Sequence, residues 1–527
     1  MSLSFDLISE PFIPCLRTDG QFVEYGLRDV LMKSHEIAEI RDTSPLVMIA
    51  LHRFLLAILH RCYRGPKKVA ERVAIHEAGK FDGERIVGYF NKWLDRFDLF
   101  HEKFPFYQQP GFKTAEPSGI NRLAQELSRG NNAALFDHTT DHPPPTVLPA
   151  EAARLVIAEQ SFAVGGGKSD TGNTTHAPLV SGAVVLVLGA TLFETLWLNL
   201  TIFGLKHPVA GLENDTPVWE RSPSELHKQS ARPNGYLDYL TWQSRTLRLL
   251  TEKEDEKDVV RQVCYAQGRK LETAPGFYDP MIAYTRDEKE GDRPVRFNEI
   301  KDLWRDSVAL FQFGETDQFK GPTTLHTLSA AELGDVLPRS AKYRLSVFGL
   351  CTDKAKVNFW RHETLPLPLA YLDYTELVEV LKLALKLAEE VGKALRAAVW
   401  ATASDRLSGD SGMKSDKDRV SALVESFAPE RMYWSRLELP YRELIVNLAD
   451  AASPENRTVL IQSWFFDTLK PTALDAFEGT IGRLDSARDL KAVTTGRRML
   501  HGRLKEVQKA NRVPDRVPDP KPKEGVA

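Results

Sequence analysis

Three glycines followed by a lysine and a serine, Gly165–Ser169, are the residues of this sequence that most resemble a phosphate-binding loop. In such loops the glycine N–H groups surround the phosphates and the lysine neutralises them. The Walker motif also needs a glycine five positions before Gly167, and Phe162 stands there, which disfavours nucleotide hydrolysis. Because glycine has no side chain, Gly165, Gly166 and Gly167 can still approach a nucleic acid closely. A simple flexible connection is the other interpretation that the pattern allows.

The segment Asp137–His142 holds two aspartates and two histidines, whose side chains can bind metal ions. They precede three prolines and lack the helical i, i+4 spacing that aims two imidazoles at one ion, so we expect surface histidines and no bound metal. The sequence contains no G-x-S-x-G, H-E-x-x-H or Cys-x-x-Cys motif, so we expect no catalytic residues and no cofactor. A nucleotide- or metal-dependent nuclease that uses Lys168 or the His138 cluster is the alternative function.

A third candidate is the segment Tyr343–Leu365, where apolar and polar residues alternate on both sides of a polar break at Thr352–Lys354. The alternation predicts two strands and the break predicts a tight connection, so we interpret the segment as a β-hairpin with Lys354 at its tip. Phe359 and Trp360 are expected to form its rigid base. Such a finger fits insertion into a partner better than an enzyme pocket, although an ordinary surface hairpin has the same pattern.

Positive charge is concentrated near the C-terminus, whereas the whole chain has a formal net charge of −3. Arg497, Arg498, Arg503 and Lys505 lie in an expected helix with almost no acidic residue four positions away. Unpaired positive charge on one element is what phosphate contact requires. A solvated helix face is the alternative interpretation.

The composition is that of a soluble globular protein, with 42% hydrophobic and 27% charged residues among 527. This length predicts roughly two to four domains. The four cysteines are widely separated, which argues against a zinc site and against a disulfide framework. No secretory signal is visible, and the apolar segment Pro45–Cys62 is interrupted by histidines and arginines, which indicates a buried helix and no membrane span. We expect a cytoplasmic protein.

An α+β fold must position these candidates, with a large mixed α/β domain over residues 1–365 followed by a four-helix bundle over residues 366–512. Helical patterns in the first domain occur at Gly26–Ser34, Pro45–Cys62, Arg85–Asp98, Leu192–Phe203 and Asn298–Phe311. Strand-like alternation or short apolar runs occur at Ser4–Ile13, Arg154–Ala163, Ala183–Gly189, Val259–Tyr265 and Asp279–Tyr284. The segment Leu237–Leu250 fits either a strand or a helix.

The C-terminal third has a helical pattern throughout. Apolar residues over Leu377–Ala398 recur at alternating spacings of four and three, which is the core-facing seam of a helix. The helix expected at Pro454–Gly479 begins with an N-cap serine and a proline, and Pro471 should kink or split it. Further helices are expected at Arg419–Ala452 and Asp485–Lys509. The tail, residues 513–527, repeats prolines and charges and is expected to be disordered.

Several stretches resemble the CasA family, the large subunits of the type I-E CRISPR surveillance complex called Cascade. In chain order they are LISEPFIP, FPFYQ, AALFDH, AVGGGKS, TWQSR, DPM and VFGLCTDKAKVNFWRHE, followed by a helical C-terminal third. Each stretch alone is unspecific, but their order, spacing and the total length make the resemblance specific over essentially the whole chain.

The resemblance implies a subunit without catalytic activity that binds a guide RNA and the other Cascade subunits, and no membrane. It would recognise the protospacer-adjacent motif in double-stranded DNA and start strand separation, and so R-loop formation. It would also help to recruit the helicase-nuclease that degrades the target.

The resemblance also implies site residues, because in the family a glycine loop, a lysine-bearing loop and a hairpin tip approach the motif from the minor groove. The matching positions are Gly165, Gly166, Gly167, Lys270 or its neighbour Arg269, Asp353, Lys354 and Ala355. The segment that contains Asn131, Asn132 and Phe136 matches the loop that docks into the complex near the RNA 5′ handle. The basic residues of the last helix would then hold the DNA backbone.

One position departs from the family pattern. The residue at the hairpin tip is typically glutamine, whereas this chain has Lys354. An ammonium group donates to minor-groove acceptors and to phosphates, but it cannot accept a hydrogen bond from the guanine amino group. Either the tip acts by its shape and tolerates lysine, or the preferred motif differs.

Overall fold

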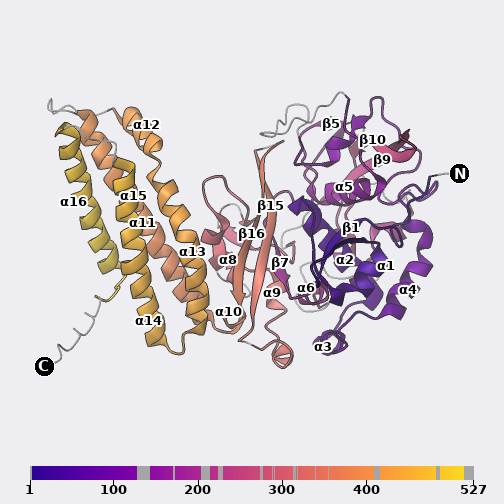
Figure 1. The fold of residues 1–527 in the computed structure, drawn as a ribbon, viewed down its shortest axis with the longest axis horizontal. Helices are drawn as coiled ribbons and strands as arrows, with labels where there is room; N and C mark the ends of the chain where they lie inside the picture. The colour runs from indigo at the N-terminus through magenta and orange to yellow at the C-terminus, as the bar shows by residue number, and fades with distance from the viewer. Residues whose placement is uncertain are drawn as a thin grey trace. The chain divides into compact units, whose positions relative to one another are not determined.

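The computed structural model describes residues 3–127, 143–169, 172–202, 214–222, 230–272, 277–287, 289, 291–312, 316, 318–338, 340–353, 355–408, 416–481 and 487–515. The chain forms two compact units, Met1–Leu365 and Pro366–Ala527 (Figure 1). The first unit mixes helices and sheets and the second is helical, so the predicted α+β class is confirmed.

A small antiparallel sheet opens the first unit, with strands β1 (Ile13–Arg17), β2 (Phe22–Tyr25) and β3 (Ile37–Ile40) in the order β2-β1-β3. The alternating segment before it forms turns up to Glu10 and no strand. The reason is local, because the Asp6 carboxylate accepts a hydrogen bond from the backbone N–H of Ile8 at 3.0 Å and turns the chain.

Helix α2 (Pro45–Tyr63) is the core helix of this unit. The Ser44 hydroxyl caps it by accepting from the Val47 N–H at 3.2 Å, and Pro45 occupies the first turn. By length and composition α2 could span a membrane, but 78% of its most apolar window is buried inside the unit. The predicted buried helix is therefore confirmed.

Helix α4 (Gly83–Lys92) packs beside α2 and against the shorter helix α1 (Leu27–Met32). Helix α4 starts after its N-cap Asp82 and ends at Lys92, earlier than the predicted Asp98, and a 3-10 turn follows. The remaining short elements are α3 (Val69–Glu77), α9 (Thr323–His326), β4 (Ser118–Gly119), β5 (Lys168–Ser169), β6 (Gly172–Asn173), β8 (Ser230–Ala231), β11 (Lys270–Leu271), β13 (Gly291–Pro294) and β14 (Phe319–Lys320).

Helix α5 (Pro149–Phe162) occupies the segment that was predicted as a strand at Arg154–Ala163, so that prediction was wrong. Its consecutive residues Leu155, Val156 and Ile157 are all buried. A helix that is buried on nearly all sides has no amphipathic period, and its short apolar run looks like a buried strand.

A long antiparallel hairpin of β9 (Arg245–Glu254) and β10 (Lys257–Gln267) follows helix α7 (Tyr236–Leu240), so the ambiguous segment 237–250 contains both a helix and a strand. The strand predicted from Asp279 begins only with β12 (Tyr284–Asp287), and the helix predicted from Asn298 begins only with α8 (Ser307–Phe311), after a 3-10 turn. In both cases the first side chain accepts a hydrogen bond of 2.8 Å from the backbone N–H two residues on, which favours a turn.

The predicted hairpin is confirmed as β15 (Lys342–Asp353) and β16 (Lys356–Pro368), which lie in a sheet of order β16-β15-β7 with β7 (Val184–Leu188). Helix α6 (Leu192–Asn199) follows β7. The two long strands are visible in Figure 1, where their tip rises toward the glycine loop, residues 164–175, which carries β5.

The second unit is built around one long helix. Its elements are α10 (Ala370–Asp373), α11 (Thr375–Ser408), α12 (Lys417–Phe427), α13 (Pro429–Asp450), α14 (Pro454–Ser463), α15 (Lys470–Ile481) and α16 (Ala487–Ala510). Helix α11 packs against α12, α13, α15 and α16, and the predicted seam over Leu377–Ala398 is buried. Tyr433 and Trp464 donate hydrogen bonds of 2.9 and 3.0 Å to carbonyls of α11, which fixes the register of the neighbouring helices.

Two interruptions shape this unit. The helix expected to continue over Arg419–Ala452 is in fact two helices, because Ala428 is left-handed with a φ of 45° and Pro429 starts α13. Between α14 and α15 the predicted split occurs as a π-helical turn, Trp464–Leu469. Pro471 has no N–H for the usual i−4 carbonyl, and the wider turn before it accommodates its ring.

Candidate nucleic-acid interface

The glycine loop is a narrow hairpin that Thr174 closes. The Gly166 N–H donates to the Thr174 carbonyl at 3.0 Å, and the Thr174 N–H donates to the Gly167 carbonyl at 2.8 Å. The Thr174 hydroxyl also accepts from the Gly167 N–H at 3.0 Å. These hydrogen bonds leave the backbone of Gly166 and Gly167 at the protein surface, where both residues are exposed.

The glycine loop and the hairpin tip touch each other at Gly166 and Ala355. A Cβ atom on Gly166 would stand 2.5 Å from the Cβ of Ala355, and the φ of Gly166 is +122°, a value that only glycine adopts without strain. Gly165 is equally constrained, since its Cβ would meet the Thr175 carbonyl carbon at 2.4 Å. Gly167 is not, because its nearest neighbour would be the Thr174 hydroxyl at 3.8 Å. Two stretches separated by almost 190 residues therefore form one continuous surface.

A buried arginine, Arg245, holds both ends of the glycine loop. Its guanidinium Nη2 donates to the carbonyls of Ala163 at 3.1 Å and of Thr175 at 2.8 Å, which lie before and after the glycines. Its Nε donates to the Tyr265 hydroxyl at 2.6 Å. Sequence reasoning missed this residue, although it is the last residue of the TWQSR stretch.

The charge of Arg245 is balanced through Tyr265, whose hydroxyl donates to the Glu159 carboxylate at 2.7 Å. Burial, followed by the effect of Glu159, raises the pKa of Tyr265 to about 12, so this hydroxyl keeps its proton and bridges the two charges. Beside them, the Gly165 N–H donates to His176 Nδ1 at 3.1 Å, which requires a neutral acceptor nitrogen. Burial and the nearby Arg245 lower the pKa of His176, which favours that neutral form.

The second candidate loop begins where Gln267 contacts the glycine loop. The Gln267 side-chain oxygen accepts from the Thr175 N–H at 2.7 Å. Lys270 follows three residues later in β11, so its Cα lies within about 11 Å of that of Gln267. Lys270 is half-buried and remains a candidate. Arg269 is not free to bind DNA, because it is buried and forms hydrogen bonds of 2.7 and 3.2 Å with Asp238.

The hairpin tip is exposed at Asp353 and Ala355, and Lys354 between them lies outside the described residues. The expected aromatic base is only partly formed. Phe359 is half-buried beneath the Arg361 guanidinium, 4.8 Å from its ring centre, but Trp360 is 41% exposed. The buried face of β15 against β7 supports the finger instead.

Other predicted residues lie outside the described part of the chain. They are Asn131, Asn132 and Phe136 of the docking segment, and the His138 cluster. Lys168 belongs to β5, but its side chain is not described. Over the residues that the structure does describe, no group of three or more His, Cys, Asp or Glu side chains is arranged to hold a metal ion.

The basic face of α16 is partly neutralised by another helix. Arg497 forms two hydrogen bonds of 2.7 Å with Glu478 of α15, so the expectation that Arg497 lacks an acidic partner was wrong. The i±4 rule detects partners on the same helix and not those across a helix pair. Arg498, Arg503 and Lys505 are exposed and have no ion pair among the described residues.

Comparisons with known proteins identify the family of this chain. Residues 6–476 match the family model described as CRISPR-associated protein Cse1. The chain is 34% identical over 509 residues to the CRISPR-associated protein CasA/Cse1 of Thermus thermophilus, covering 93% of this chain and 95% of that protein.

Solved structures show the same fold. The structure of Thermus thermophilus CasA (Cse1) matches with a TM-score of 0.80 and 30% identity over 95% of this chain and 99% of that one. Cse1 from Acidimicrobium ferrooxidans matches with a TM-score of 0.81 and 25% identity over 97% and 99%. A chain of a CRISPR RNA-guided surveillance complex matches with a TM-score of 0.75 and 24% identity over 94% and 99%. The chain therefore belongs to the CasA/Cse1 family of CRISPR-associated proteins.

Proposed function

We propose that this chain is the large, non-catalytic subunit of a Cascade-type CRISPR RNA-guided surveillance complex, and that it recognises the protospacer-adjacent motif in double-stranded DNA. Family membership and the fold shared with a chain of such a complex support the assembly. The contact of Gly166 with Ala355 is the observation that carries the DNA-reading role, because it joins the glycine loop and the hairpin tip into one surface.

This surface has the properties that minor-groove contact requires. Exposed glycine backbone at Gly166 and Gly167 can come closer to DNA than any residue with a side chain. Asp353 and Ala355 are exposed beside it at the hairpin tip, and Lys354 stands between them in the sequence. The minor groove distinguishes mainly A·T from G·C pairs, so such a reader accepts several short motifs. The ammonium of Lys354 finds acceptors on every base pair, and it gains nothing from the guanine amino group.

A hairpin tip that separates two DNA strands must also be held rigidly by the rest of the protein. Opening a base step costs a few kcal/mol, which protein contacts and growing guide pairing must offset. Arg245 and Gln267 hold the glycine loop, and the pairing of β15 with β7 holds the hairpin. These contacts support the proposal that the tip presses on DNA without folding back.

Strand opening is tested with the double variant Asp353→Ala, Lys354→Ala. We expect it to weaken binding of the assembled complex to a duplex target much more than to a target already unpaired at the motif. The matched control is Lys356→Ala, which removes a lysine of the same hairpin that is exposed at the start of β16. Equal losses on both targets would show that the tip supplies charge and does not open DNA.

The same function includes a guide RNA, the other Cascade subunits and a recruited helicase-nuclease as partners. Asn131, Asn132 and Phe136 are proposed to dock beside the RNA handle, and Arg498, Arg503 and Lys505 to hold the DNA backbone. Co-expression should yield a complex that contains a short guide RNA. Recovery of this chain without RNA or other subunits from the co-expressing cells would contradict the assembly.

A further inference from the structure

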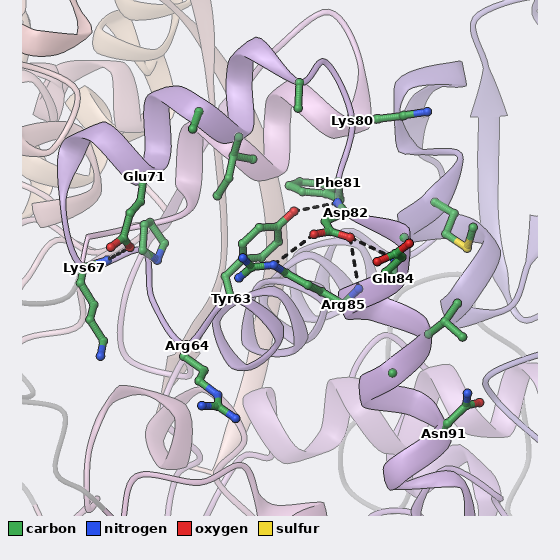
Figure 2. A pocket seen from close by; sticks show the side chains of 18 residues that line it. Tyr63, Arg64, Lys67, Glu71, Lys80, Phe81, Asp82, Glu84, Arg85 and Asn91 are labelled. Carbon is green, nitrogen blue, oxygen red and sulfur yellow. Dashed lines mark hydrogen bonds and ion pairs between the residues drawn. The ribbon is translucent and has the colours of Figure 1, made fainter.

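A groove of about 1310 Å³ lies in the first unit, far in sequence from the glycine loop, between the C-terminal end of α2 and helices α3 and α4 (Figure 2). Helix α3 packs on α6, whereas α4 packs on α1 and α2, so the two helices rest on different supports. Small-molecule pockets span about 300–1,000 Å³, and this groove exceeds that range. It continues into an adjoining hollow of about 430 Å³ that shares the lining residues Arg64, Arg85 and Gly88.

The walls of the groove are held firmly. Arg72 fixes α3 from behind, because its buried guanidinium donates to the Trp197 and Leu198 carbonyls at 3.0 and 2.8 Å. Burial lowers the pKa of Arg72 to about 9, so it stays charged at neutral pH. The start of α4 is fixed by Tyr63, whose hydroxyl accepts from the Asp82 N–H at 2.8 Å.

Small side chains leave the groove open. Ala74 of α3, Ala78 directly after α3 and Gly88 of α4 are exposed in its walls. A Cβ on Gly88 would meet no atom within 4 Å. Short side chains on both walls let a helix backbone approach closely.

Charge at the rim is unbalanced toward the positive. Arg64, Lys67 and Lys80 are exposed and have no ion pair among the described residues, and Lys67 and Lys80 lie on opposite sides of Tyr63 (Figure 2). The acidic residues of the lining, Glu71, Asp82 and Glu84, all lie at the N-terminal end of α3 or α4. The helix dipole and the N–H groups there already compensate them.

We propose that this groove binds an acidic amphipathic helix of a partner protein. The apolar stripe of such a helix would cover the small residues, and its carboxylates would pair with the three rim cations. A nucleic acid strand fits less well, because the aromatic faces that could stack bases are occupied. Arg85 lies 5.2 Å from the Tyr63 ring centre, and Lys92 lies 5.3 Å from that of Trp93.

The test uses the purified full chain, so it does not depend on DNA recognition. A fluorescent helical peptide of about 14 residues, roughly 21 Å long, carries a Leu/Ala stripe flanked by glutamates. A second peptide carries lysines in place of the glutamates, and an eight-nucleotide RNA is the third probe. We expect binding of the acidic peptide alone, with an affinity that falls as salt rises.

Two variants locate the binding. Gly88→Trp fills the groove and should lower the affinity for the acidic peptide about tenfold or more. The matched control Gly88→Ala adds one methyl group in open space and should leave this affinity unchanged. Lys67→Glu with Lys80→Glu changes only exposed side chains and should shift the preference to the basic peptide. Equal binding of both peptides, preferential binding of the RNA, or an unchanged affinity in Gly88→Trp would overturn the proposal.

Discussion

Replacing Gly166 by alanine tests whether the glycine loop and the hairpin tip act as one surface. The new Cβ would stand 2.5 Å from the Cβ of Ala355, at a φ of +122°. Holding a residue with a side chain at such a φ costs about 1–3 kcal/mol. The overlap with Ala355 adds about 1–3 kcal/mol if neither stretch moves.

The exposed loop can escape this strain by moving away from the tip, so the cost should appear as lost DNA affinity and not as unfolding. With a combined cost of about 2 kcal/mol, the lowest value, only about 3% of molecules keep the native arrangement. The apparent affinity for a motif-containing duplex then falls about 30-fold. Fluorescence anisotropy at fixed salt measures this loss, and the melting temperature checks that the chain stays folded.

Two further variants separate the causes. Ala355→Gly in the Gly166→Ala background removes the overlapping Cβ atom. The affinity lost through the steric overlap should then be recovered, whereas the loss caused by the unfavourable φ of residue 166 should remain. Gly167→Ala is the matched control for a side chain on the DNA-facing surface, since its Cβ would have only the Thr174 hydroxyl within 4 Å, at 3.8 Å. It therefore measures the affinity lost through a less close approach to DNA, without any effect on the contact between loop and tip. If Gly166→Ala and Gly167→Ala bind the duplex equally well, the contact between loop and tip has no part in DNA recognition.

Three other changes have expected outcomes. The double variant Arg498→Glu, Arg503→Glu should lower DNA affinity and reduce the slope of log affinity against log salt concentration by about 2. Arg497→Gln is the control and should change DNA affinity little, because Glu478 already pairs with Arg497. An unchanged salt slope in the double variant would show that this face of α16 is only solvated. Arg245→Lys keeps the positive charge but loses the guanidinium group, which donates to the carbonyls at both ends of the glycine loop. Thermal melting should therefore show a destabilisation of about 3 kcal/mol. A melting temperature equal to that of the wild type would show that Arg245 does not hold the loop. Burial lowers the pKa of His52 from 6.5 to about 4, so the free energy of unfolding should be highest above pH 6.5 and fall by up to about 3 kcal/mol toward pH 4. His52→Gln should make this pH dependence flatter. An unchanged pH profile in His52→Gln would show that other groups cause the decline in stability.

The sequence alone was sufficient where the signal is local and periodic. The two-residue alternation of the hairpin, the seam of α11 and the capped start of α14 each follow from how a single strand or helix presents its side chains. The glycine loop could also be selected from its composition, because only glycine tolerates close backbone approach. The order of the matching stretches was sufficient to indicate the CasA family, which the comparisons confirm.

Tertiary structure decided the rest, because the deciding contacts join residues that are distant in sequence. Helix α5 is buried on nearly all sides, so its sequence shows a continuous apolar run like that of a buried strand. Arg497 is neutralised by Glu478, which lies on a neighbouring helix. Arg245 became the clamp of the glycine loop only when β9 placed it beneath both ends of that loop. The contact of Gly166 with Ala355 likewise depends on how β15 pairs with β7, and no local pattern encodes that packing.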